Sequence, residues 1–283
     1  MADQQIKSIT GWTYYTIENE LNKFISSYKE YDEKGRLIEE TDYLARDEIE
    51  MKVLFAYDNQ GKLVKKTHYY AEESPSEVTY YTYTSEGRLK HEEVVYPDGS
   101  KMIKNYLYDP KTRQATITIL DENEKLEEKQ VKTYDENNNV IADESYDNKN
   151  KLKEKTTYEY NENNKPVTET VLSPKGKTRY KKFYRYDEAG NLVQSQTLNK
   201  KGRVIDVIKY TYDEQNRRME VQHGIGNFIE YEYNDAKRTV KVKEYGNGGL
   251  ENEVVLKYNQ DGYLVEERHA DTKTSYVYNF YNK

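Results

Sequence analysis

Apolar and polar residues alternate with a period of two along most of this chain, and short turn-forming segments interrupt the alternation. Between residues 180 and 186, Tyr180, Tyr184 and Tyr186 fall on one face of an extended strand, with Phe183 and Arg185 on the other. A period of two is typical of β-strands whose faces have different surroundings. The sequence therefore predicts a succession of strands joined by turns.

One recurring turn has the pattern Tyr-Asp, two variable residues, Gly, Arg or Lys, then Leu, as in the segment from Tyr31 to Leu37. Asp at the first position and Gly at the fourth favour a type I turn followed by a residue with positive φ, which makes a hairpin loop with a β-bulge. In this register Asp32 faces Arg36, and Tyr31 faces Leu37. Where Gly is missing, the residue is often Asn, which tolerates positive φ: Asn138, Asn164 and Asn216.

The tyrosine of this turn recurs ten times, at intervals of 25 or 26 residues apart from one of 21. Such a period indicates a repeat architecture, and a second, looser turn lies about twelve residues after each first one. We expect an all-β fold: a repetitive antiparallel β-meander of about 20–22 strands, largely a single-layer sheet, twisted or spiralled because neighbouring strands rotate by roughly 20°. The sequence does not determine whether this sheet closes into a shell or stays an open ribbon. The tyrosines are Tyr31, Tyr57, Tyr83, Tyr108, Tyr134, Tyr160, Tyr186, Tyr212, Tyr233 and Tyr258.

The chain divides into two parts on this pattern. Residues 26–283 form the array of about ten 26-residue hairpin units. Residues 1–25 contain the only tryptophan, Trp12, and an apolar set without a matching turn. We expect this N-terminal segment to cap the first edge strand, which would otherwise template aggregation.

Composition supports a thin sheet. Charged residues make up 34% of the chain, mean hydropathy is −1.14, and much of the apolar supply is its 31 tyrosines. The net charge is −7 with both signs interleaved, so no basic stripe predicts a nucleic-acid partner. No apolar run is long enough to predict membrane insertion. We expect a monomer. The chain has no cysteine, which fits the cytoplasm and bacterial surface proteins equally.

The Tyr-Asp pattern resembles the YD repeat of bacterial RHS proteins and animal teneurins, over about residues 26–283. The resemblance implies a spiralling β-sheet that wraps into a shell, which encloses a toxin in the bacterial proteins and belongs to an adhesion receptor in teneurins. A second resemblance, at Gly11-Trp12-Thr13-Tyr14-Tyr15, is to choline- and glucan-binding repeats, although their repeated tryptophans are missing here.

The histidines and acidic residues show no arrangement that is typical of a catalytic or metal site. The four histidines are scattered without metal-ligand spacing, and no cysteine is present, so we expect no zinc site and no cofactor. Acidic turns such as Asp121-Glu122 and Asp135-Glu136 lack the spacing of a calcium loop, and calcium binding is left open. Among 51 acidic residues no carboxylate pair stands out. We expect a protein that is not an enzyme.

The tyrosines are the feature with functional potential, because each offers a rigid ring and a hydroxyl at low entropic cost. We hypothesise a bacterial surface or secreted module that binds a glycan or a protein. The alternatives are an intracellular scaffold or immunity-type protein that binds a partner by its sheet edge, and a partial shell around an effector. A structural role for the same tyrosines is also open. The candidate ligand-binding residues are Tyr81, Tyr83, Tyr106, Tyr108, Tyr158, Tyr160, Tyr184, Tyr186, Tyr210, Tyr212, Tyr231 and Tyr233.

Overall fold

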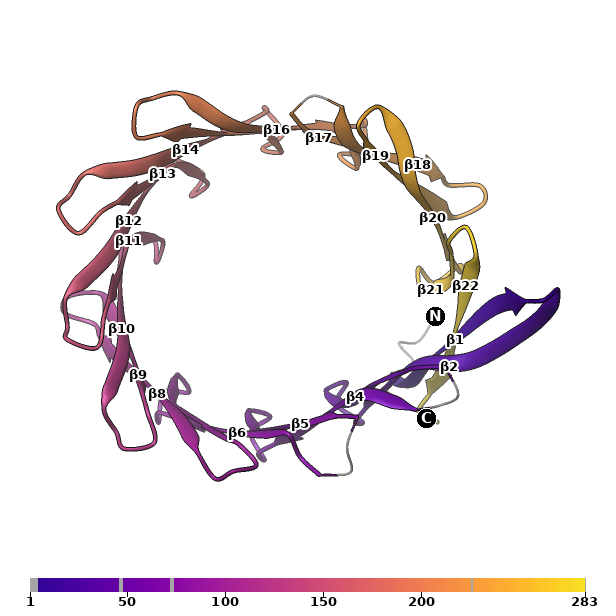
Figure 1. Ribbon diagram of the computed structural model, residues 1–283, viewed down its shortest axis with the longest axis horizontal. Coiled ribbons are helices and arrows are strands. Elements are labelled where there is room, and N and C mark those ends of the chain that lie inside the picture. The colour runs from indigo at the N-terminus through magenta and orange to yellow at the C-terminus, as the bar shows by residue number, and fades with distance from the viewer. Residues whose placement is uncertain (1–4, 46–47, 72–73, 225, 283) are drawn as a thin grey trace.

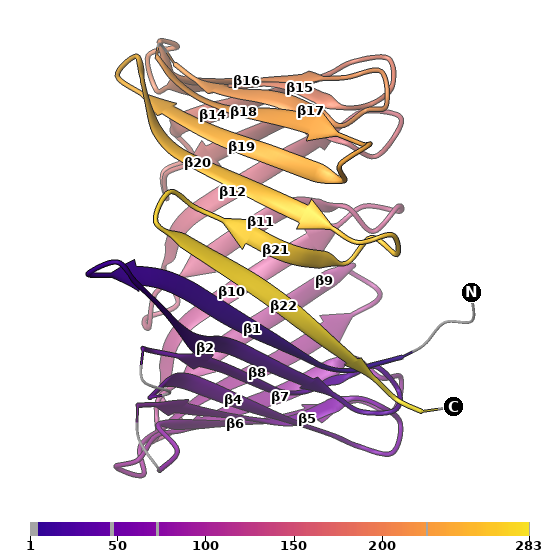
Figure 2. The ribbon, with the colours of Figure 1, turned by 90° about the vertical axis from the view of Figure 1, so that its right-hand side faces the viewer.

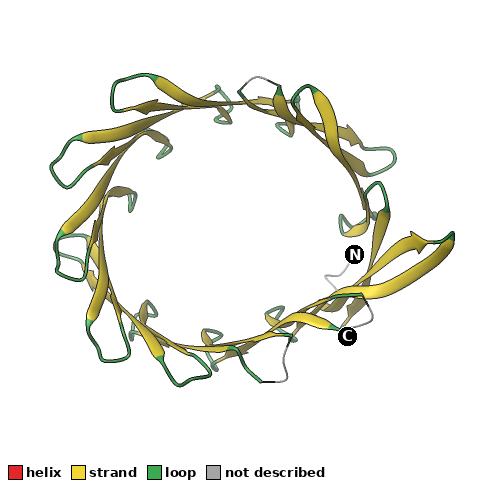
Figure 3. Cartoon of the chain, in the orientation of Figure 1, coloured by secondary structure: helices red, strands yellow, loops and turns green. Residues whose placement is uncertain are grey.

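The computed structural model describes residues 5–45, 48–71, 74–224 and 226–282, and these form one antiparallel sheet of 22 strands (Figures 1 and 3). The strand number falls within the expected range, and the sheet is a single twisted layer. The first eleven strands are β1 (Ile6–Ile17), β2 (Glu20–Tyr31), β3 (Leu37–Tyr43), β4 (Ile49–Tyr57), β5 (Leu63–Tyr70), β6 (Glu77–Tyr83), β7 (Leu89–Val95), β8 (Lys101–Asp109), β9 (Gln114–Leu120), β10 (Leu126–Tyr134) and β11 (Val140–Tyr146).

The second half of the chain continues the same meander. Its strands are β12 (Leu152–Tyr160), β13 (Pro166–Leu172), β14 (Thr178–Tyr186), β15 (Leu192–Asn199), β16 (Val204–Tyr212), β17 (Arg218–His223), β18 (Asn227–Asn234), β19 (Thr239–Gly246), β20 (Gly249–Tyr258), β21 (Leu264–Arg268) and β22 (Thr272–Phe280).

The sheet closes on itself, a point that the sequence left open. Strand β1 pairs with β2 on one side and with the last strand, β22, on the other, from Ile6 opposite Phe280 to Tyr15 opposite Thr272. The result is a ring of strands with both described chain ends near one seam (Figures 1 and 2). Residues 5–25, within the segment expected to act as a cap, contain β1 and the start of β2, so they cover the edge of β22 as an integral strand. Residues 1–4 lie outside the described part.

Most of the Tyr-Asp turns have the expected geometry. At the first one, Gly35 N–H donates to Asp32 O at 2.9 Å, and Asp32 N–H donates to Arg36 O at 2.9 Å. Gly35 has φ +77°, and Tyr31 pairs with Leu37 as expected. The asparagines that replace glycine also have positive φ, at +64° for Asn138, +57° for Asn164 and +59° for Asn216.

Two rims follow from this order of turns. The turns after even-numbered strands form the Tyr-Asp rim, and those after odd-numbered strands form the opposite rim. In Figure 1 the Tyr-Asp rim is the farther one and its turns curl toward the inside of the ring, whereas turns of the opposite rim splay outward. Figure 2 places the two chain ends at the Tyr-Asp rim, on the right.

Backbone chirality determines which face of the sheet is interior. Asp32 N–H points to β3, so the preceding residue, Tyr31, directs its own N–H and C=O toward β1. For an L-residue seen with its side chain toward the viewer and the chain running upward, these groups point right, so β1 lies to the right of β2. In Figures 1 and 2, β1 lies to the right of an upward-running β2 only when the sheet is seen from inside the ring. The face that carries Tyr31 is therefore the interior face.

Burial agrees with this assignment, because the concave side of a curved sheet is the more crowded. The buried apolar side chains all lie on the interior face: Val53, Val94, Ala115, Val171 and Val221. Large apolar side chains on the exterior face are more exposed, with 69% for Leu107 and 49% for Val277. Small buried threonines, such as Thr41 and Thr168, fill the exterior face at mid-strand.

Candidate functional site

All twelve candidate tyrosines lie on the interior face, because cross-strand pairing keeps them on one side of the sheet. They separate into two sets along the strands. The rim tyrosines lie at or one residue before the end of their strands at the Tyr-Asp rim, and the belt tyrosines lie two residues earlier, toward the middle of each strand. The rim tyrosines are Tyr83, Tyr108, Tyr160, Tyr186, Tyr212 and Tyr233, and the belt tyrosines are Tyr81, Tyr106, Tyr158, Tyr184, Tyr210 and Tyr231.

Most rim tyrosines join one hairpin unit to the preceding one through their hydroxyl groups. Tyr186 Oη donates to Pro166 O at 2.8 Å, and Tyr212 Oη donates to Leu192 O at 2.9 Å. Each acceptor is the residue that follows the previous Tyr-Asp turn, twenty positions back in the chain. The same bond is made by Tyr57 to Leu37, Tyr83 to Leu63 and Tyr160 to Val140.

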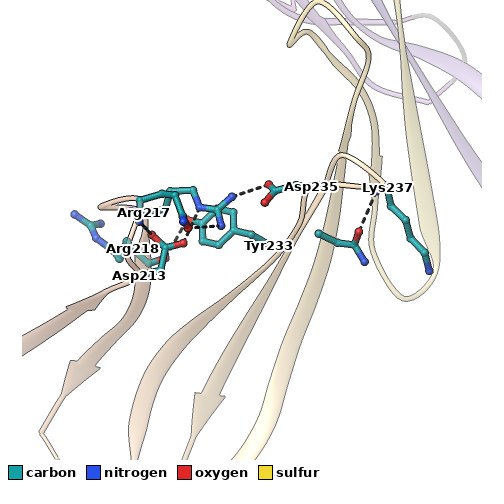
Figure 4. Close-up of polar contacts among 8 residues, drawn as sticks. Asp213, Arg217, Arg218, Tyr233, Asp235 and Lys237 are labelled. Atoms are coloured by element: carbon teal, nitrogen blue, oxygen red, sulfur yellow. Dashed lines mark hydrogen bonds and ion pairs between the residues drawn. The ribbon is translucent and has the colours of Figure 1, made fainter.

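A basic residue from the preceding turn also covers several rim rings. Lys165 Nζ lies 5.4 Å from the centroid of the Tyr186 ring, and Lys62 Nζ lies 5.3 Å from that of Tyr83. In Figure 4 Arg217 lies over Tyr233, at 4.3 Å between the guanidinium carbon and the ring centroid. The Arg or Lys of the repeat thus forms a cation–π contact with the next unit. Most rim tyrosines are therefore engaged in contacts that hold neighbouring units of the sheet together.

The aspartate of the repeat holds its own turn. Asp32 Oδ1 accepts hydrogen bonds from the N–H groups of Lys34 and Arg36, at 2.9 and 3.0 Å, and Oδ2 accepts one from Arg36 Nε at 2.7 Å. Because these donors favour the charged form, chiefly the Arg36 side chain, they lower the pKa of the Asp32 carboxyl. Asp at this position is therefore a turn residue, and its carboxylate is already satisfied.

Four of the belt tyrosines have different neighbours, namely carboxylates from odd-numbered strands; they are Tyr81, Tyr106, Tyr158 and Tyr184. On β7, Glu92 lies opposite Tyr81, accepts a hydrogen bond from Tyr106 Oη at 3.0 Å and forms an ion pair with Lys104 at 3.1 Å. The result is a cluster of two rings, two hydroxyls, a carboxylate and an ammonium group on three adjacent strands.

A second cluster of the same kind lies on β12, β13 and β14. Glu169 lies opposite Tyr158 and opposite Lys182, and accepts a hydrogen bond from Tyr184 Oη at 2.9 Å. Lys182 Nζ lies 5.3 Å from the centroid of the Tyr184 ring. We call these two sets the Glu92 cluster and the Glu169 cluster.

The chemistry of the clusters is that of binding groups at neutral pH. Burial, with the nearby Glu92 carboxylate, raises the pKa of Tyr106 to about 12. Burial and then the hydrogen bond to Glu169 raise the pKa of Tyr184 in the same direction. Both phenols therefore stay protonated and serve as hydrogen-bond donors beside charged acceptors.

The belt is interrupted at β10, where Lys132 takes the place of a tyrosine. Lys132 Nζ lies 3.7 Å from Asp143 Oδ2, and Gln130 donates two hydrogen bonds of 2.8 Å to the same carboxylate. The candidate tyrosines consequently form one group on β6 and β8 and another from β12 to β18. The structure adds Tyr276 on β22, whose hydroxyl donates to Glu267 at 3.2 Å.

The belt carboxylates and Tyr276 were not among the residues singled out from the sequence. A signal for them exists, because Glu92 follows Tyr81 and Glu169 follows Tyr158 by eleven residues in each case. That spacing takes the chain around one Tyr-Asp turn to the opposite position on the next strand. This spacing indicates a cross-strand Tyr–Glu pair only once the register of the bulged hairpin is known.

No family model matches the chain, and no curated protein matches it. Among solved structures, the chain is similar to a porin-like protein from Bacteroides uniformis, with 12% identity, a TM-score of 0.38, and 97% and 96% of the two chains covered. It is also similar to a structure described as the eukaryotic initiation factor, with 6% identity, a TM-score of 0.31, and 95% and 98% covered.

A protein of unknown function from Bacteroides fragilis is a further similar structure, with 12% identity, a TM-score of 0.17, and 60% and 88% of the two chains covered. At these TM-scores the similarities carry no argument about function. The described residues form no helix with the length and apolarity that a membrane span requires.

Proposed function

We propose that this protein is a non-enzymatic binding module that holds a glycan against the belt tyrosines inside its ring. The observation that carries the proposal is the repeated combination of rings, phenol hydroxyls, a carboxylate and a lysine in the Glu92 and Glu169 clusters. A sugar ring has apolar C–H faces that stack on an aromatic ring, and hydroxyl groups that both donate and accept hydrogen bonds. Each cluster offers partners for both properties.

The size of the ring supports an enclosed ligand. A barrel of eight strands is filled by its own side chains, whereas sixteen or more strands leave an open interior. With 22 strands at a spacing of about 4.8 Å, the perimeter is about 106 Å and the diameter about 34 Å before strand tilt widens it. Such an interior is wide enough for a glycan chain to contact both clusters.

A second candidate function is the shielding of a polypeptide effector, which the closed β1–β22 seam favours. The resemblance to YD repeats points in the same direction, because the shell of the bacterial proteins encloses a toxin. Binding by strand addition is less favoured, since every strand of the described sheet already pairs on both sides. A partner could add to this sheet only after the seam had opened.

We place the protein on the bacterial surface or outside the cell, with the cytoplasm as the alternative. This assignment rests on the proposed binding role and on the resemblance to YD-repeat proteins; the absence of cysteine from the sequence fits both compartments. Fractionation of the native cell with an antibody against the protein would separate the two compartments.

The deciding experiment is binding of the purified protein to a broad glycan array, with calcium and with a chelator. We expect saturable binding to a defined sugar class. Tyr184→Leu should weaken it about tenfold or more, because it removes an interior ring and donor. Phe183→Leu is the matched control, because its side chain lies next along the same strand but on the exterior face, and binding should change less than about twofold.

An array without saturable binding would overturn the glycan proposal. Co-purification of a second polypeptide, released when the ring is unfolded, would then make shielding of an effector the leading function. Equal losses from Tyr184→Leu and Phe183→Leu would place the glycan elsewhere than on the interior belt.

A further inference from the structure

Two turns at the Tyr-Asp rim depart from the repeat in the same way. Between β8 and β9, Asp109 pairs directly with Gln114, and between β18 and β19, Asn234 pairs directly with Thr239. Most other hairpins at this rim have a register shift immediately before the terminal tyrosine, but these two have none. The loops therefore lack the bulge of the regular turns, after most of which the first strand residue accepts a hydrogen bond from the next rim tyrosine.

The tyrosine that follows each irregular turn loses its usual anchor. Tyr134 N–H donates to Arg113 O at 2.9 Å, and Tyr258 N–H donates to Arg238 O at 2.9 Å. Within the described residues neither tyrosine hydroxyl makes a hydrogen bond. A pocket lies at each turn, with a volume of about 530 Å³ beside Tyr134 and about 380 Å³ beside Tyr258.

The larger pocket contains an arginine without a carboxylate partner in the described chain. In a regular unit the first turn residue is Asp and binds the arginine that ends the turn, as Asp32 binds Arg36 at 2.5 Å. In the unit before the larger pocket this position is Thr84, whose hydroxyl oxygen accepts a hydrogen bond from the backbone N–H of Arg88, at 3.3 Å. The Arg88 guanidinium lies over the Tyr108 ring, at 5.3 Å from its centroid, with its hydrogen-bond donors available.

The acidic groups of the larger pocket are already engaged. Asp135 accepts hydrogen bonds from its own turn at 2.9 and 2.8 Å. Asp109 accepts one from the Thr112 hydroxyl at 2.9 Å, and Glu136 pairs with Arg113 at 3.1 Å. Their remaining lone pairs are acceptors, so the pocket offers donors, acceptors and two tyrosine rings together.

The smaller pocket has the same loop, but the arginine that corresponds to Arg88 has carboxylate partners there. Arg217 pairs with Asp213 and with Asp235, both at 2.7 Å, and Tyr233 Oη donates to Arg218 O at 2.9 Å (Figure 4). The two pockets therefore form a matched pair at one position: Arg88 has no carboxylate partner among the described residues, whereas Arg217 has two.

We propose that the larger pocket, beside Arg88, Tyr108 and Tyr134, binds a single uncharged pyranose residue, the terminal unit of the glycan. This inference rests on the proposed glycan-binding function and locates a subsite for it at the mouth of the ring. Two arginines and three carboxylates line the pocket, so an acidic sugar would meet repulsion, whereas neutral hydroxyls can bond to either kind of group. The volume is in the range of small-molecule sites.

The test is titration of the whole protein with the methyl pyranosides of glucose, galactose and mannose, and with glucuronate, followed by NMR of the arginine and tyrosine side chains. One neutral pyranoside should saturate and shift Arg88 and Tyr134. Arg88→Gln should weaken it about tenfold or more, because a charged donor is lost. Arg217→Gln, the matched control, should change it less than about twofold, and thermal unfolding would verify that both variants fold.

Saturable binding of glucuronate alone, equal losses from Arg88→Gln and Arg217→Gln, or no saturation by any sugar would each overturn the subsite. The array separates this failure from that of the proposed function. Glycan binding that depends on Tyr184 but not on Arg88 would leave the function standing without the subsite. If pyranoside binding depended on Arg88 but array binding were unchanged by Tyr184→Leu, the subsite would be supported and the binding role of the belt tyrosines would not.

Discussion

The rim tyrosines and the belt tyrosines lie two residues apart on the same strands and the same face, yet their contacts differ in kind. On β16, the Tyr212 hydroxyl bonds to the backbone of the preceding unit, at Leu192 O, whereas the Tyr210 hydroxyl has no hydrogen bond among the described residues. On β14, Tyr186 bonds to a backbone carbonyl and Tyr184 bonds to the Glu169 side chain.

The difference shows how one residue type serves two purposes in a single-layer sheet. A backbone carbonyl is a fixed acceptor, so a tyrosine that bonds to it sets the spacing of neighbouring hairpins. A carboxylate side chain can turn toward a ligand, so a tyrosine beside it remains available for binding. The regular part of the repeat, Tyr-Asp with its turn, therefore contributes to stability, and the position two residues earlier is the one we propose for ligand binding.

This comparison assumes that the ring is closed, and a disulfide across the seam tests that assumption with the largest effect. Thr13 and Thr274 pair across β1 and β22 with their hydroxyl oxygens 2.8 Å apart. Thr13→Cys with Thr274→Cys should form a disulfide, since the chain has no other cysteine, and should stabilise the protein by about 5 kcal/mol because the closed loop is long.

Urea unfolding of the oxidised and reduced double variant measures this gain, with each single variant as control. If the two cysteines stayed reduced under oxidising conditions, the seam would be open in solution. The interior face, and the comparison built on it, would then have to be abandoned.

The rim turn itself is tested by Gly61, which has φ +85°. Gly61→Val should lower the free energy of unfolding by about 1–3 kcal/mol, because a β-branched residue is strained in this conformation. Gly61→Asn should be mild, since asparagine occupies the equivalent position at Asn138. Urea unfolding compares the two, and similar losses would contradict the turn geometry as the source of the effect.

The comparison of rim and belt is sharpened by Tyr212→Phe and Tyr210→Phe, two removals of one hydroxyl from one strand. Tyr212→Phe should lower the free energy of unfolding by about 1 kcal/mol, because Leu192 O loses its donor. Tyr210→Phe should be nearly neutral. Chemical denaturation decides between them, and a larger loss at Tyr210 would reverse the roles of the two sets.

The smallest expected effect is a dependence on alkaline pH at the Glu92 cluster. The pKa of Tyr106 is raised to about 12, above the ordinary value of about 10, so folding favours the protonated phenol. The contribution of this pKa difference to the free energy of unfolding is therefore fully present below about pH 10 and is lost as pH rises toward 12. Tm of Tyr106→Phe should fall less steeply than that of the native protein over this window.

Below pH 9 the two Tm curves should run parallel, which serves as the internal control. Equal slopes above pH 10 would show that the phenol of Tyr106 is not held in its protonated form by its surroundings.

Much of the architecture follows from short-range pattern. The alternation of residues predicts the strands, and Asp32 to Gly35 predicts a turn whose hydrogen bonds and positive φ the structure confirms. The positions of Tyr184 and Tyr186 on one face also follow, because a period of two needs no tertiary information. The partner of Tyr184 does not follow, since Glu169 reaches it through the register of a separate bulged hairpin.

By itself, then, the sequence determined the repeat, the strands, the turn geometry and the shared face of the tyrosines, all of which depend on contacts within one hairpin. Only the tertiary structure decided that β1 meets β22, and that Arg88 has no carboxylate partner among the described residues while Arg217 has two. These features depend on the twist and coiling accumulated over 22 strands and on neighbours in adjacent units. A local pattern cannot specify a sum of small rotations, and that sum is what closes the ring.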